Sequence, residues 1–136
     1  MTISDYRVYQ EDDFEQQLTS NVIGRGAFAI VFKLKNKSDN QDYAVKVISG
    51  DNLSDFPAEA EILSRIQYPT IIKFYGIINR FPCGIVLEYI PNHTIHYYLD
   101  AISKGININE WNTTNKFISI LGISLGMRYL FSVIIT

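Results

Sequence analysis

The sequence predicts an α+β fold in which five short strands and one helix come before one or two further helices. Three features carry this prediction. β-Branched and aromatic runs alternate with clusters of turn residues through the first two thirds of the chain. An amphipathic stretch over residues 56–67 separates the third run from the fourth. A long apolar stretch begins at about residue 112.

The composition is that of an ordinary globular protein. Hydrophobic residues make up 47% and charged residues 19% of the 136 residues, which is enough apolar material for a core. The net charge of −2 gives no overall attraction to nucleic acid, so we expect no nucleic-acid partner. The single cysteine, Cys83, excludes an internal disulfide, and residues 1–5 do not resemble a signal peptide. We therefore expect a cytoplasmic protein.

Three segments are predicted along the chain. Residues 1–18 form a polar, acidic leader, which Phe14 and Leu18 are expected to dock on the domain. Residues 19–90 hold the strands and the first helix. Residues 91–136 hold the remaining helices.

A glycine-rich turn lies within residues 23–31. Gly24 and Gly26 have no Cβ atom, so the backbone can bend sharply and its N–H groups can approach phosphate oxygens. In dinucleotide-binding folds such glycines lead into a helix. Here they lead into residues 30–34, which are β-branched and aromatic, and the turn residues 36–40 follow. The glycines therefore predict a turn between two strands.

Lys46 lies inside an apolar strand, where a lysine requires an anionic partner. The next helix carries two candidates, Glu59 and Glu61. At about 100° per residue, one face of this helix collects most of its apolar side chains. These side chains are Phe56, Ile62, Leu63 and Ile66, and Glu59 lies among them. Because Glu61 lies roughly opposite, toward solvent, Glu59 is the predicted partner of Lys46.

Two more strands are expected after this helix, which begins near residues 54–55 and ends before Pro69. They cover residues 70–76 and 85–89, and a polar break follows them.

The C-terminal part is predicted to hold a short helix over residues 94–99 and a long helix from about Asn112. The long helix is apolar nearly all round, which is typical of a buried helix. Where nothing covers it, residues 117–135 would expose an apolar surface of the kind that marks an interface or an aggregation risk. Residues 117–136 contain one charge, so a membrane span is an alternative. That charge, Arg128, would cost about 3 kcal/mol inside a bilayer, which disfavours the span.

Five motifs follow one another in an order typical of one family. They are the glycine turn, Ala44-x-Lys46, the helix with Glu59, the pair Glu88-Tyr89, and the Gly-Met-Arg-Tyr-Leu of residues 126–130. In this order they resemble the protein kinase domain, and residues 74–76 and 126–130 resemble its tyrosine-kinase-like members. The resemblance implies an N-terminal lobe with a five-stranded antiparallel sheet and one regulatory helix. A hinge and the first helices of the C-terminal lobe would follow.

The resemblance also implies an ATP site in the N-terminal lobe. Lys46 and Glu59 would form the ion pair that positions the phosphates. Leu87 would lie at the back of the pocket, and Glu88 and Ile90 would be the hinge contacts. The residues expected to bind ATP are Ile23, Gly24, Arg25, Gly26, Ala27, Phe28, Ala29, Val31, Ala44, Lys46, Leu87, Glu88 and Ile90.

The catalytic motifs of the family do not occur in these 136 residues. No His-Arg-Asp and no Asp-Phe-Gly is present, and no aspartate follows Asp100. In the family these motifs supply the proton acceptor and a ligand of Mg²⁺. We therefore expect a kinase-like chain truncated before the catalytic loop, with no metal site, that binds ATP but does not phosphorylate proteins by itself. The alternatives are a non-catalytic module that binds a partner kinase, with the C-terminal helix as a possible contact surface, and a membrane anchor formed by that helix.

Overall fold

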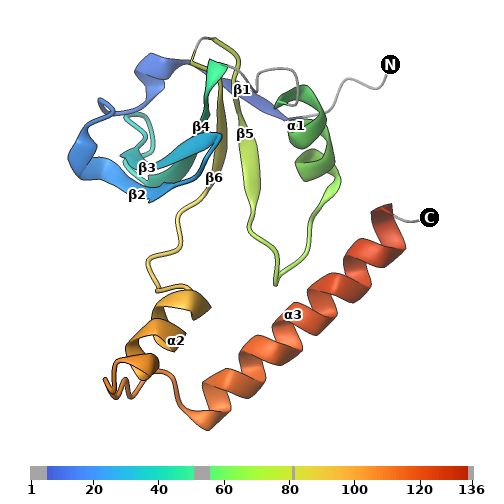
Figure 1. Cartoon of the computed structure of the whole chain (residues 1–136). Coiled ribbons are helices and arrows are strands. Elements are labelled where there is room, and N and C mark those ends of the chain that lie inside the picture. The colour runs from blue at the N-terminus through green and yellow to red at the C-terminus, as the bar shows by residue number, and fades with distance from the viewer. Residues whose placement is uncertain (1–5, 51–55, 81, 135–136) are drawn as a thin grey trace. The chain divides into compact units, whose positions relative to one another are not determined.

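The computed structural model describes residues 6–50, 56–80 and 82–134, which form two compact units (Figure 1). The first unit takes the described residues of Met1–Gln67 and Ile71–Tyr89. The second takes those of Tyr68–Thr70 and Ile90–Thr136.

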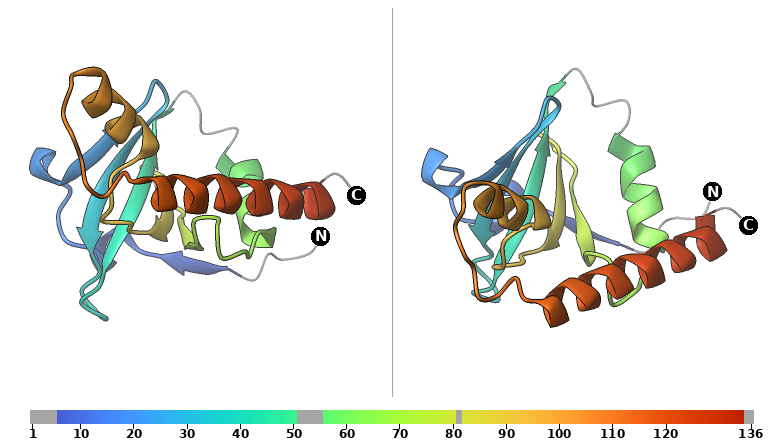
Figure 2. Two further views of the ribbon diagram at one scale, coloured as in Figure 1. Left: turned by 90° about the horizontal axis from the view of Figure 1, so that it is seen from below. Right: turned by 60° about the horizontal axis from the view of Figure 1, so that its bottom comes forward.

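A six-stranded sheet forms the body of the first unit. Its strands are β1 (Arg7–Tyr9), β2 (Val22–Arg25), β3 (Ala29–Lys35), β4 (Asp42–Ile48), β5 (Phe74–Ile78) and β6 (Gly84–Glu88). Their order in the sheet is β1-β5-β6-β4-β3-β2, and every neighbouring pair is antiparallel except β1 and β5, which are parallel. Helix α1 (Phe56–Arg65) packs beside β5 (Figures 1 and 2). The predicted α+β class is confirmed, with one strand more than expected.

The additional strand comes from the leader. Residues 1–18 are predicted to lie outside the sheet, yet they contribute β1 at its edge. Two short 3₁₀ helices follow, η1 (Glu11–Asp13) and η2 (Thr19–Asn21). Of the two expected anchors, Phe14 is 3% exposed, whereas Leu18 is 49% exposed and anchors nothing.

One asparagine side chain fixes the turn between β3 and β4. Oδ1 of Asn36 accepts hydrogen bonds from the N–H and the hydroxyl of Ser38, at 2.9 and 2.6 Å. Asn40 has a left-handed backbone with a φ of 59°, a region that asparagine enters more readily than most residues. The turn sets the β3–β4 register that places Val31 opposite Lys46.

Each face of the sheet carries an apolar cluster, because successive side chains along a strand point to opposite sides. The cluster that joins α1 to the sheet has the buried members Ile48, Phe56, Ala60, Ile77 and Ile85. The cluster on the other face has the buried members Tyr9, Phe14, Leu34, Tyr43, Val45, Ile78 and Val86. Lys46 shares the face of α1, since it lies two residues before Ile48 on β4.

Helix α1 buries most of the predicted stripe, but the stripe is shifted away from Ile62. Phe56 and Ala60 are buried and Leu63 is partly buried, but Ile62 is 50% exposed. The apolar stripe is therefore centred near Ala60, and Glu59 lies at its edge. The predicted start of the helix at residues 54–55 lies outside the described residues.

The second unit has a small aromatic core. Its first helix, α2 (Ile95–Ser103), begins at Thr94, whose side chain accepts a hydrogen bond from an N–H of the first turn. Tyr98 is 8% exposed and stacks on Trp111 with a centroid distance of 5.0 Å. Its hydroxyl donates to Oε2 of Glu110 at 3.3 Å.

Helix α3 (Thr113–Ile134) has 22 residues, and most of its apolar side chains are exposed. Those more than half exposed are Phe117, Ile118, Ile120, Leu121, Ile123 and Phe131. These side chains form the exposed apolar surface that is expected where nothing covers the helix. By length and composition alone, residues Thr113–Val133 could cross a membrane.

Candidate functional site

A row of residues crosses four strands on the face of the sheet that α1 covers. Gly24 on β2 lies opposite Val31 on β3, Val31 lies opposite Lys46 on β4, and Lys46 lies opposite Ile85 on β6. Directly opposed side chains lie on the same face, with their Cβ atoms about 5 Å apart. The sheet register therefore brings Lys46 beside the glycine turn.

Lys46 forms an ion pair with α1. Its Nζ atom lies 2.6 Å from Oε1 of Glu59, and the two side chains are 31% and 38% exposed. Glu61, the rejected candidate, pairs with Arg65 one turn further along the helix. An ammonium has three N–H donors, so Lys46 can bind a second anionic group while it contacts Glu59. Because the pair is partly solvated, its own contribution to folding is modest.

The tip of the glycine turn is tied to the end of β4. The N–H of Gly26 donates to the carbonyl oxygen of Ala29 at 2.9 Å. The N–H and the hydroxyl of Ser49 both donate to the carbonyl oxygen of Phe28, at 3.0 and 2.8 Å. Sequence reasoning did not select Ser49, although its place directly after the strand of Lys46 was an available signal. The side chain of Phe28 is 64% exposed.

The packing of the protein itself does not require either glycine of this turn. A Cβ atom on Gly24 would lie 3.8 Å from Cβ of Val31, and one on Gly26 would lie 3.7 Å from the carbonyl oxygen of Ala29. Both are ordinary contacts, and neither glycine has a positive φ. The missing side chains therefore leave the backbone of the turn open to an approaching ligand.

Three of the residues expected to bind ATP lie together. Ala44 lies opposite Leu87, and both share the face of Val31 and Lys46. Ala44 is 6% exposed, and Val31 and Leu87 are partly buried. Ile23 is 50% exposed and lies at a shift in the β2–β3 register. An apolar surface thus continues from Lys46 toward the end of β6.

The remaining predicted residues lie at the ends of this face or in the other unit. Arg25 and Ala27 are exposed around the turn. The backbone N–H of Glu88 donates to the carbonyl oxygen of Lys73 at 2.9 Å, and Oε1 of Glu88 accepts from the N–H of Lys73 at 2.6 Å. Ile90 belongs to the second unit, where it is 51% exposed.

A tyrosine and an aspartate with shifted pKa values lie outside this site. The hydroxyl of Tyr43 donates to Oδ2 of Asp39 at 2.5 Å. This hydrogen bond, followed by burial, raises the pKa of Tyr43. The same bond, followed by one from the N–H of Gln41, lowers the pKa of Asp39. Because Tyr43 and Lys46 are three residues apart on β4, their side chains lie on opposite faces.

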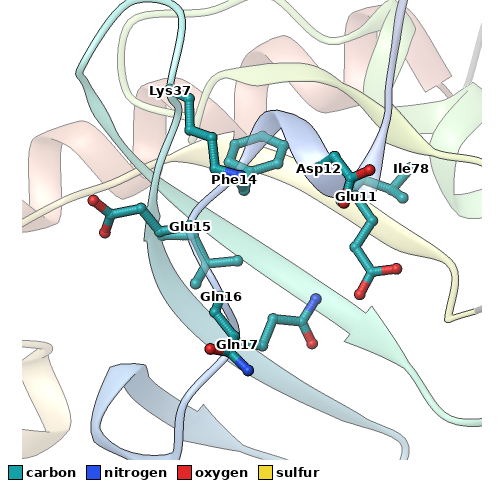
Figure 3. Close-up of a pocket in the computed structure, with 9 residues that line it drawn as sticks. Glu11, Asp12, Phe14, Glu15, Gln16, Gln17, Lys37 and Ile78 are labelled. Carbon is teal, nitrogen blue, oxygen red and sulfur yellow. The ribbon is translucent and has the colours of Figure 1, made fainter.

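A pocket of about 180 Å³ lies where the leader crosses the sheet (Figure 3). Leader residues such as Glu11, Phe14 and Gln17 line it on one side, and Leu34 and Ile78 line it on the other. It contains none of the predicted ATP-binding residues. Within residues 6–50, 56–80 and 82–134, no group of three or more His, Cys, Asp or Glu side chains could hold a metal ion.

Comparison with known proteins identifies the family of the chain. The family model described as the protein kinase domain matches residues 18–136. The chain is 31% identical to the proline-rich receptor-like protein kinase PERK8 of Arabidopsis thaliana over 94% of its own length and 19% of that protein. It is 32% identical to the cysteine-rich receptor-like protein kinase 10 of the same plant, over 93% of its length and 19% of that protein. It is also 34% identical to the mouse cytoplasmic tyrosine-protein kinase BMX, over 62% of its length and 13% of that protein. The chain thus spans less than a fifth of the length of these relatives.

Proposed function

Since this chain belongs to the protein kinase domain family, whose members transfer phosphate to proteins, we propose that its first unit binds ATP. Lys46 would hold the phosphates, and Val31, Ala44 and Leu87 would provide the apolar wall for adenine. Glu88, at the end of β6, would supply a hinge contact.

The observation that carries the proposal is the ion pair of Lys46 and Glu59 at 2.6 Å. Placing a lysine on the apolar strand β4 has a desolvation cost, which one partly exposed carboxylate offsets only in part. A bound phosphate would give the ammonium a second anionic partner, and hydrogen bonds between charged groups are stronger than neutral ones. The pair therefore fits a site that is completed by an anionic ligand.

The glycine turn supports the same proposal. It lies in register beside Lys46, and its glycines are not required by packing within the chain. Open backbone with N–H groups beside a fixed positive charge is a favourable environment for phosphate oxygens. When bound, ATP supplies the phosphoryl group that the family transfers.

We propose that the 136-residue chain binds ATP without transferring its phosphate to a protein. The sequence contains neither the His-Arg-Asp nor the Asp-Phe-Gly motif, so it lacks the proton acceptor and the Mg²⁺ ligands that the family uses. Phosphoryl transfer depends mainly on positioning and charge stabilisation, which those groups provide.

Two measurements on the 136-residue chain test this function. Melting with excess ATP should raise the Tm of the first unit, because a ligand that binds only the folded state stabilises it by about 2.7 kcal/mol at a hundred times its Kd. Incubation with labelled ATP, Mg²⁺ and generic protein substrates should give no transfer. Reproducible transfer that Lys46→Met abolishes would overturn the second part of the proposal.

A second candidate function is protein binding through α3. Its exposed apolar residues form a surface of the kind that marks an interface or an aggregation risk. The partner that we propose for this surface is another kinase. Binding of such a partner should be lost in a variant that carries a charge at Leu121.

A further inference from the structure

The edge strand β1 is held by more than its own hydrogen bonds. It has three residues and pairs with β5 through Arg7 and Gly76, Val8 and Ile77, and Tyr9 and Ile78. So short a strand at the edge of a sheet makes few ladder bonds, so side chains must contribute to its docking.

Two tyrosines of the leader pack on opposite faces of the sheet. Tyr6 packs edge-on against Phe74, with ring centroids 5.4 Å apart, and joins the cluster that contains Phe56 and Ala60 of α1. Tyr9 is 3% exposed and belongs to the cluster on the other face. Side chains three residues apart in an extended segment point to opposite sides, so this spacing suits an edge with an apolar surface on each face.

Gly76 of β5 is shaped by the approach of the leader. A Cβ atom at this position would lie 2.0 Å from the carbonyl oxygen of Arg7 and 3.1 Å from Cε2 of Tyr9. The first contact is with backbone, which cannot move aside without unpairing β1. Gly24 and Gly26, by contrast, have room for a Cβ atom. Glycine at position 76 is therefore required for strand docking.

The leader beyond β1 pairs with the end of β3. The N–H of Glu15 donates to the carbonyl oxygen of Lys35 at 2.9 Å, and the N–H of Lys37 donates to that of Asp13 at 2.8 Å. Phe14 is buried, with its ring 5.4 Å from that of Tyr9, but the pocket of Figure 3 lies between the following residues and the sheet. The leader is thus attached through backbone pairing and aromatic anchors together, as a docked extended peptide is.

We propose that the outer edge of β5 is a strand-docking site for an extended segment with aromatic residues three apart, that residues 6–9 occupy it, and that Tyr6 thereby positions α1. Tyr6 is a positioning residue, since it acts on Glu59 only through α1. The consequence for ATP rests on the proposed function, whereas the docking itself does not.

Hydrogen exchange in the full 136-residue chain tests the docking without any nucleotide. Tyr6→Ala should speed exchange of the α1 amides about fivefold or more, while the central strand β4 keeps its protection, because α1 is loosened locally. Gly76→Val should expose β5 and α1 together. Val8→Ala is the matched control, since Val8 is 51% exposed. It should change amide exchange in neither α1 nor β5. Unchanged α1 exchange in Tyr6→Ala, or equal acceleration in α1 and β4, would overturn the proposal.

A peptide rescue keeps the test decisive if Gly76→Val does not fold. Tyr9→Ala removes the buried anchor of β1, so β1 and the adjoining Tyr6 should undock and α1 exchange should speed up as in Tyr6→Ala. In Tyr9→Ala, a free peptide of residues 6–15 at millimolar concentration, the range of effective concentrations for tethered segments, should restore α1 protection. The same peptide with alanine at positions 6 and 9 should not, and failure of the first peptide or success of the second would contradict the docking site. Weaker binding of an ATP analogue by Tyr6→Ala would extend the result to the nucleotide. If the wild-type chain binds no ATP, the exchange results still decide the docking.

Discussion

Nζ of Lys46 and Oε1 of Glu59 lie 2.6 Å apart, although one residue is on a strand and the other on a helix. The pair is the point at which α1, the sheet and the glycine turn meet, because Lys46 is also in register with Val31 and Gly24. Whatever moves α1 relative to β4 changes this distance.

Glu59→Gln should weaken binding of an ATP analogue about fivefold, or by about 1 kcal/mol, because Lys46 loses the charge that orients it. Glu61→Gln is the matched control, since Glu61 pairs with Arg65 on the solvent side of the same helix. Isothermal titration of both variants measures the difference. Equal affinities in the two variants would show that the ion pair has no part in binding.

Alanine at position 24 or 26 should separate binding from folding. The Cβ atom fits at both positions, so stability should stay equal or rise by up to about 1 kcal/mol through the lower entropy of the unfolded chain. Affinity for the ATP analogue should fall, because the Cβ atom occupies the approach to the backbone. Denaturant melts and titrations of the same samples check both effects. A large loss of stability would contradict the packing described for the turn.

Tyr43→Phe should change the dependence of folding stability on pH in the acidic range. The folded-state pKa of Asp39 is lowered mainly by the hydrogen bond from Tyr43. A lowered pKa contributes stability that is present above the unfolded value of about 3.9 and is lost as the pH falls through the folded value. The Tm of Tyr43→Phe should therefore lie below that of the wild type at pH 7, and the gap should narrow below about pH 4.

The raised pKa of Tyr43 affects stability at alkaline pH. Its stabilising effect is present below the unfolded value of about 10 and is lost as the pH rises beyond it, so the gap should also narrow in strong base. Tyr89→Phe, outside this cluster, should show neither trend. If the Tm difference between the wild type and Tyr43→Phe is constant from about pH 2 to about pH 7, which spans the usual carboxylate pKa, Asp39 does not have this role.

Leu121→Lys should reduce self-association of the chain. Leu121 is 59% exposed within the apolar surface of α3, and a charge there opposes burial against another molecule. Ser124→Lys adds the same charge at an exposed polar position and should have less effect. Sedimentation velocity measures the change. A wild-type chain that is a monodisperse monomer would contradict this prediction, and flotation with liposomes would instead indicate a membrane anchor.

The sequence was sufficient to predict the strand-rich lobe, because turn residues such as those at 36–40 separate clear apolar runs. The partner of Lys46 also followed from helical spacing. The position of the buried stripe of α1 did not follow from the sequence. The contact with the sheet centres on the small residue Ala60, whereas helical periodicity gives more weight to large side chains such as Ile62. Exposure of α3 was expected where no partner covers it, but its apolar sequence does not say what would cover it, since it is compatible with a core, an interface or a membrane.

β1 could not be predicted because three residues show too little alternation, and its neighbours are acidic. The pairing depends on a close approach at Gly76, nearly seventy residues away, which becomes visible only when the two segments are side by side. Prediction therefore fails here because of a long-range contact rather than because of local propensity.

Direct titration of the 136-residue chain with a fluorescent ATP analogue tests the central claim, that Lys46 holds the phosphates. We predict saturable binding that Lys46→Met weakens about tenfold or more, equivalent to about 1.4 kcal/mol. Lys35→Met, which removes an equal charge and an ion pair with Asp42 from the same sheet, should leave the affinity unchanged. The claim would be contradicted if the folded wild type showed no saturable binding, or if Lys46→Met and Lys35→Met lost the same affinity for the ATP analogue.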